Sequence, residues 1–298
     1  MTLLLLGLYL AATGVLLPRR LAGSPTLQAR LQARPALGAA LWLALMASFT
    51  VALVLAAHHA VEPAAHDPAG LIGLLPHTDR PGPVVPHTHD WWQLSAAGAA
   101  LTAVLAAVGA RARRARRRHR AVLDVVAVRD RRWGALVLEH AHPTVYCLPG
   151  RRSRVVLSRG ALRLLDERQL TAAVAHEHGH IRGRHHLFRL PADTFALLLG
   201  PLPLARLGRS EVALLLEMAA DDAALAEVSR SELASALCAL AGSGAAPGHG
   251  LGVAATGVLA RVRRLARPGG GRRRQLGWRI AVLTLPVAPY LLACAPHP

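Results

Sequence analysis

The sequence predicts a multi-span α-helical membrane protein of about four transmembrane helices, with an α+β domain inserted on the cytoplasmic side before the last helix. Apolar runs without charge approach or reach the about 20 residues that cross a bilayer. Arginines gather at the ends of these runs. Between them, residues 121–275 show strand-like and then helix-like patterns, which are typical of an α+β domain.

The composition agrees with a membrane protein. Hydrophobic residues make up 53% of the 298 residues and charged residues only 17%, whereas a soluble domain averages about 25% charged residues. A chain with this many apolar residues is not expected to be intrinsically disordered. The three cysteines, Cys147, Cys238 and Cys294, lie far apart. Their spacing excludes a disulfide scaffold and a cysteine-clustered metal site.

The expected spans differ in length. The two central runs, 36–57 and 91–110, are long enough to cross a bilayer without a charge, whereas the first and last uncharged runs, 2–17 and 280–295, are shorter. Arg19 and Arg20 follow the first run. Because a signal peptide carries its positive charge before the apolar run, this order favours an anchor. The expected transmembrane helices are about 2–17, 36–57, 91–110 and 276–298.

Arginine clusters set the expected orientation. They lie between the first two spans, after the third and before the fourth, which is one side of a four-span layout. The positive-inside rule places residues 121–275 in the cytoplasm and the His- and Pro-rich loop 58–90 outside. Topology and contact with anionic lipid of the bilayer account for the net charge of +18. Nucleic-acid binding is not expected, because the clusters adjoin the spans and lack interleaved aromatic residues.

The inserted domain begins with strand-like runs. Residues Ala121–Val128 and Trp133–Glu139 are expected strands, and Pro149-Gly150 predicts a hairpin between Thr144–Leu148 and Ser153–Ser158. The edge of this hairpin is a candidate for pairing with an extended peptide; core sheet is the alternative. Cys147 within it is interpreted as a small packed hydrophobe.

The second half of the domain is helical. Asp166 and Gln169 form a capping-box pattern, so a helix is expected over 167–182. Further helices are expected over about 211–228 and 231–241, with a loop over 242–252. Residues 187–207 are apolar but contain charges and prolines, and fit either a membrane-dipping hairpin or a soluble helical lobe.

The expected helix 167–182 carries the chemistry. His176 and His180 are four residues apart, so one face of the helix presents both imidazoles to one point. With Glu177 they form the H-E-x-x-H pattern, in which the glutamate is the general base beside a zinc ion. A solvated His- and Arg-rich helix is the alternative. His185 and His186 are interpreted as surface residues, and the histidines of loop 58–90 belong either to a metal-binding tract or to a Pro-rich loop.

A catalytic zinc needs a third protein ligand from another part of the fold. The next long helix offers Glu217, with Asp221 one turn later on the same face. We expect Glu217 to reach the metal and Asp221 to accept the second N–H of a ligand histidine. Zinc, one per chain, would then activate a water molecule for peptide hydrolysis, with Glu177 transferring the proton.

These motifs resemble a known family. The hairpin residues Val145 to Gly150, the helix with His176-Glu177-His178-Gly179-His180, and the later Glu217 and Asp221 look like the bacterial membrane zinc metallopeptidases of the beta-lactam-sensor antirepressor family. HtpX-like and CAAX prenyl proteases share the plan. The resemblance implies a gluzincin, zincin-like domain over 121–275, with a cytoplasmic active site in the plasma membrane of a bacterium. Since the sequence ends after the last span, the external sensor domain of that family is not expected.

The resemblance implies a zinc metalloendopeptidase whose partner is a protein or peptide substrate. In the sensor members, that substrate is a cytoplasmic transcriptional repressor, so a winged-helix repressor is one expected partner. A membrane-protein quality-control protease is a second hypothesis. A non-catalytic membrane scaffold with a degenerate site is a third, disfavoured because His176, Glu177, His180 and Glu217 are all present.

Overall fold

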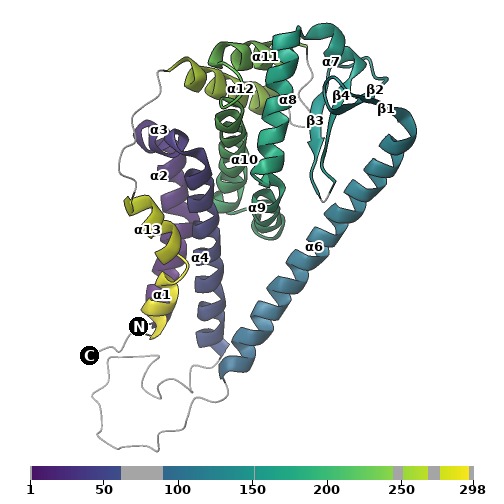
Figure 1. Cartoon of the computed structure of the whole chain (residues 1–298). Helices are drawn as coiled ribbons and strands as arrows, with labels where there is room; N and C mark the ends of the chain where they lie inside the picture. Colours follow the sequence, from purple (N-terminus) through teal and green to yellow (C-terminus); the bar gives the residue numbers. More distant parts are fainter. Residues whose placement is uncertain (1, 62–89, 151, 244–250, 268–275, 295–298) are drawn as a thin grey trace, which may run out of the picture.

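The computed structural model describes residues 2–61, 90–150, 152–243, 251–267 and 276–294. It is mostly helical, with one small sheet beside a group of helices (Figure 1). The expected outer loop 58–90 lies almost wholly outside the described residues, as do parts of the expected loop 242–252 and of the segment before the last span.

The N-terminal part is a bundle of apolar helices. Helix α1 (Thr2–Ala11) continues through the π-turn η1 (Ala12–Leu16) into α2 (Leu17–Gly23). A short α3 (Pro25–Ala33) then leads into the long α4 (Pro35–Val61). Within the described residues, Thr2–Gly23 and Pro35–Ala60 are the helices long and apolar enough to cross a membrane. They coincide with the first two expected spans.

The third and fourth expected spans are not confirmed. Residues 91–110 belong to α6 (Asp90–Val126), one continuous helix that also contains the arginine run. The C-terminal segment forms two short helices, α13 (Leu276–Thr284) and α14 (Ala288–Cys294). Pro286 lies between them, and proline cannot continue a helix. Neither short helix alone is long enough to cross a bilayer.

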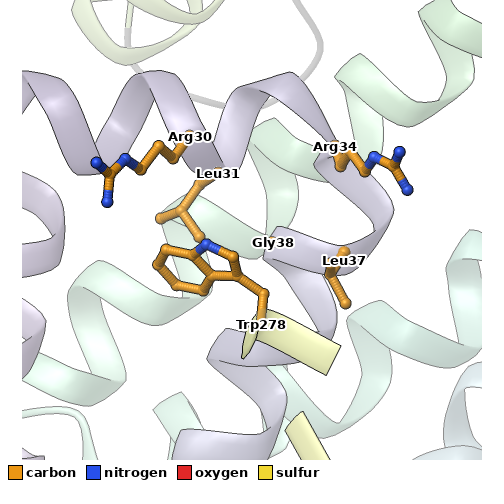
Figure 2. Close-up of a pocket in the computed structure, with 6 residues that line it drawn as sticks. All are labelled: Arg30, Leu31, Arg34, Leu37, Gly38 and Trp278. Carbon is orange, nitrogen blue, oxygen red and sulfur yellow. The ribbon is translucent and has the colours of Figure 1, made fainter. Parts of the chain in front are cut away.

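Helix α13 packs on the junction of α3 and α4. Trp278 lies against Leu31 and Gly38 in a small pocket (Figure 2), and the guanidinium groups of Arg30 and Arg34 point away from each other at its rim. Indole beside arginine at the end of an apolar helix is typical of the membrane–water interface. The pocket contains no residue of the expected metal site.

The sheet has four short strands, β1 (Ala127–Asp130), β2 (Ala135–Leu138), β3 (Val145–Leu148) and β4 (Arg154–Ser158), in the order β1-β2-β4-β3. The expected hairpin is confirmed, because β3 pairs antiparallel with β4. The expected strand Ala121–Val128 is wrong for most of its length, since residues 121–126 still belong to α6. Strand β3 forms one edge of this sheet.

The sheet lies between α6 and helix α8 (Glu167–Arg182). On one face, Leu148 and Val156 pack against Leu123 of α6. On the other, Val155 and Leu157 pack against Val174 of α8. Residues of β4 therefore alternate between the two helices, as the period of a strand requires.

Helices complete the domain: α7 (Arg159–Leu164), α9 (His185–Leu199), α10 (Pro203–Ala224), α11 (Arg230–Gly242) and α12 (Leu251–Ala266). Helix α10 begins earlier than expected, with Pro203 in its first turn, where the missing N–H costs nothing. Helix α12 was not predicted from the sequence. Residues 187–207 form α9 and the start of α10, and Phe195 packs edge-on against Phe49 of α4, with ring centroids 5.9 Å apart.

Candidate metal centre

Helix α8 has the bounds expected from the sequence. Its N-terminus is closed by a capping box: Asp166 accepts from the backbone N–H of Gln169 at 2.8 Å, and the Gln169 side chain accepts from the backbone N–H of Asp166 at 3.0 Å. Four buried residues, Ala172 to Ala175, then fix the helix against the sheet and α11. The next turn carries the histidines, so the helix is anchored before it reaches the site.

Helix α10 crosses α8 at a glycine. A Cβ placed on Gly179 would lie 2.8 Å from the backbone oxygen of Ala220 and 3.2 Å from the Cβ of Ala223. Only glycine permits this approach without displacing the α10 backbone. The close crossing brings Glu217, one turn before Ala220, to the two imidazoles of α8.

Three side chains converge at this crossing. His176 Nε2 lies 3.1 Å from His180 Nε2 and 3.3 Å from Glu217 Oε2. His180 Nε2 lies 3.4 Å from Glu217 Oε1. A tetrahedral zinc site with bonds of about 2.0–2.1 Å places its ligand atoms about 3.3–3.4 Å apart. The two imidazole nitrogens and the two oxygens of Glu217 therefore lie close to this spacing, and these residues fit a zinc ion.

Asp221 completes the arrangement on α10. It is fully buried, and its Oδ1 lies 3.0 Å from His176 Nδ1. A histidine that gives its Nδ1–H to a carboxylate presents Nε2 as a lone pair, and the carboxylate makes that nitrogen more basic. His176 is thus oriented to bind a metal through Nε2.

Arg261 of α12 joins both carboxylates, although from the sequence it was expected only in the arginine cluster before the fourth span. Its Nε donates to Asp221 Oδ2 at 2.8 Å and its Nη2 donates to Asp221 Oδ1 at 2.6 Å. Its Nη1 donates to Glu217 Oε2 at 3.1 Å. Arg261 is only 7% exposed. In the sequence, this buried role is indicated by the position of Arg261 four residues before the apolar Leu265, which places both residues on the inner face of the helix.

His185 supports the second imidazole, and its interpretation as a surface residue was wrong. It is buried at the start of α9, and its Nδ1 lies 2.9 Å from His180 Nδ1. Burial and the neighbouring His180 lower the pKa of His185 to about 4. A neutral His185 accepts the Nδ1–H of His180, so His180 also presents Nε2 to the centre.

The electrostatics of the centre favour a cation between the carboxylates. Burial opposes positive charge on His176, but hydrogen bonds to Asp221 and Glu217 outweigh it and raise the pKa of His176 to about 9. Burial also opposes ionisation of Glu217. Hydrogen bonds from the two imidazoles and the charge of Arg261 nevertheless hold the pKa of Glu217 well below its usual range.

Glu177 lies beside the edge strand. The Glu177 carboxylate lies near the Cys147 thiol, and burial followed by this negative charge raises the pKa of the thiol. Cys147 pairs with Val155, which packs against α8, so Cys147 lies on the side of the sheet that faces the site. His178, between the two imidazoles in the sequence, is not part of the cluster of possible metal ligands.

The described residues contain one such cluster, formed by His176, His180 and Glu217, with candidate ligand atoms within 4.8 Å of one another. Residues 109–240 match the model of peptidase family M48. This M48 segment contains the sheet, α8 and α10, and it ends before α12 and Arg261. The match supports a metallopeptidase. Neither a curated protein nor a solved structure matches the chain.

Proposed function

We propose that the chain is an integral-membrane, zinc-dependent metalloendopeptidase that hydrolyses peptide bonds of a cytoplasmic or membrane-associated protein. The observation that carries this proposal is the convergence of the His176, His180 and Glu217 side chains on one point within the M48 segment. Three protein ligands with a fourth position open to water or substrate are typical of catalytic zinc, whereas structural zinc takes four protein ligands.

Each residue of the centre has one task in this proposal. His176, His180 and Glu217 hold the zinc, and Asp221 and His185 fix the orientation of the imidazoles. When bound, zinc polarises a peptide carbonyl and lowers the pKa of a water molecule to about 7. Glu177, which follows His176 on α8, would take a proton from the attacking water and deliver it to the leaving amine.

The free edge of β3 offers a path for the substrate. Strand β3 pairs with β4 on one side and is the last strand of the sheet on the other. Its Cys147 lies near the Glu177 carboxylate. An extended peptide that adds to this edge by backbone hydrogen bonds would therefore pass beside the general base. The turn after β3 is held in place by Arg120, which donates to Pro149 O at 2.5 Å.

Zinc content tests the metal site directly. Purified protein is expected to hold about one zinc per chain and to lose peptidase activity when a chelator removes it. Metal analysis by mass spectrometry measures the stoichiometry. His176→Ala is expected to lose the zinc, whereas His178→Ala on the same helix is expected to keep it. A folded wild-type protein without bound metal would contradict the proposal.

The topology of the membrane part is a second prediction. Two apolar helices, Thr2–Gly23 and Pro35–Ala60, support membrane attachment, and the arginine clusters support a cytoplasmic site. A tag inserted after Arg120 is expected to be protected from an impermeant reagent in intact cells. A tag near residue 75 is expected to react. Labelling with the opposite pattern would place the metal centre outside the cell.

The substrate can be identified by comparing the proteins of cells with and without the active peptidase. We propose, from the resemblance to antirepressor peptidases, that a winged-helix repressor is the target. Cellular proteins are compared by mass spectrometry between strains with the wild-type protein and with Glu177→Gln. A repressor fragment present only with the wild type supports signalling, whereas fragments of many damaged membrane proteins would instead support quality control.

A further inference from the structure

Three arginines of α6 form a stripe on one face of the helix, which we name the cationic stripe: Arg113, Arg116 and Arg120. Residues at these spacings lie on one side of an α-helix. Gly109 continues the same face one turn earlier, and a Cβ placed on it would lie 3.4 Å from Arg113 Nη1 and 3.6 Å from Leu190 of α9. Arg116 and Arg120 are half-buried on the side of α6 that faces the protein, whereas Arg113 is exposed.

The cationic stripe borders two elements of the metal centre. Arg116 and Arg184 lie near His186 at the start of α9, and after burial their charges lower the pKa of His186. The preceding residue, His185, contacts His180. Arg120 holds the carbonyl oxygen of Pro149, directly after the edge strand. The stripe thus extends from the helix beside the imidazoles to the end of the proposed substrate path.

The charge of the cationic stripe has no counter-charge within the part of the chain that the structure describes. No carboxylate lies within 4.0 Å of its three arginines or of Arg184, whereas other arginines of the domain have such partners. Burial, and then repulsion from Arg120 and Arg113, lower the pKa of Arg116. Like charges at this spacing destabilise a helix. An anionic partner would remove this penalty.

We propose that the cationic stripe binds acidic side chains of the peptide substrate, so that the enzyme prefers Asp- and Glu-rich segments beside the scissile bond. This inference rests on the proposed peptidase function. The alternative partner is the headgroup of an anionic lipid. Arg111, Arg114 and Arg118 lie on the opposite, exposed face of α6 and fit that role. The half-buried Arg116 and Arg120 lie near the start of α9 and the turn after β3, which favours the peptide.

Peptide binding is measured in the Glu177→Gln background, so that the result does not depend on catalysis. The probes are an extended Glu-rich peptide and the same peptide with Gln at every Glu, both with the protein in neutral detergent. The stripe variant is Arg113→Glu with Arg116→Glu. The matched control, Arg114→Glu with Arg118→Glu, changes the net charge of α6 equally on the opposite face. Arg116→Gln alone serves if the stripe variant does not fold.

The unchanged stripe is expected to bind the Glu-rich peptide at least about tenfold more tightly than the Gln peptide at low salt, and less selectively as salt rises. The stripe variant is expected to lose or invert this preference, and the control is expected to keep it. Equal loss in both variants, no preference with the unchanged stripe, or loss only of binding to anionic vesicles would each overturn the proposal. If the Glu-rich peptide is preferred but wild-type protein cleaves neither peptide, the peptidase proposal fails and selective binding by the stripe stands.

Discussion

Glu177→Gln is expected to abolish peptide hydrolysis while the metal centre stays assembled. Glutamine has nearly the same shape as glutamate but cannot accept a proton from water at neutral pH. Loss of a general base lowers turnover by about 10²–10⁴-fold. None of the three candidate ligand atoms belongs to Glu177, so zinc content should not change. Turnover of a peptide substrate and metal analysis of the same preparation together check this prediction.

The matched control is Glu167→Gln on the same helix. Glu167 is 69% exposed in the first turn of α8 and pairs with Arg132, also exposed. Its replacement removes the same charge from α8 without touching the metal centre. Activity close to that of wild type is therefore expected for Glu167→Gln. Retained hydrolysis in Glu177→Gln, with zinc bound, would remove Glu177 from the role of base.

The signals of α8 were readable from the sequence because they are local. The capping box of Asp166 and Gln169 and the four-residue spacing of His176 and His180 involve only neighbouring turns of one helix. Glu217 needed one further step, since catalytic zinc requires a third ligand. No pattern in the neighbouring sequence predicts that α10 packs against Gly179. A small residue between the histidines is only compatible with a close crossing.

Long-range packing determines the elements that could not be predicted from the sequence. Residues 121–126 read as a strand because they are rich in valine, yet they continue α6, where Leu123 is buried against the sheet. Tertiary contacts commonly override such propensities. The arginines before the last expected span were read as one topological cluster. In the structure, Arg264 donates to both oxygens of Asp222 at 2.7 and 2.8 Å and lies on the same helix as Arg261.

Arg261→Gln is expected to destabilise the metal-free protein more than the zinc-bound protein. In the metal-free state Arg261 is the guanidinium that compensates Asp221 and Glu217, and Asp221 is fully buried. Leaving a buried carboxylate without its partner costs about 3–5 kcal/mol in the free energy of unfolding. Zinc also neutralises these carboxylates, so its presence should offset part of the loss. Denaturant unfolding with zinc and with a chelator measures both values.

Arg263→Gln is the control, because Arg263 is exposed on the same helix and has no ion pair among the described residues. For a substitution at such a surface site, the free energy of unfolding is expected to change by no more than about 0.5 kcal/mol. Arg261→Lys keeps the charge but loses the forked contact with Asp221, so it should fall between wild type and Arg261→Gln. Equal stability of the Arg261→Gln and Arg263→Gln proteins in chelator would show that the guanidinium of Arg261 does not support the carboxylates. A larger stabilisation by zinc in Arg261→Gln than in wild type would show that arginine and metal neutralise the same two charges.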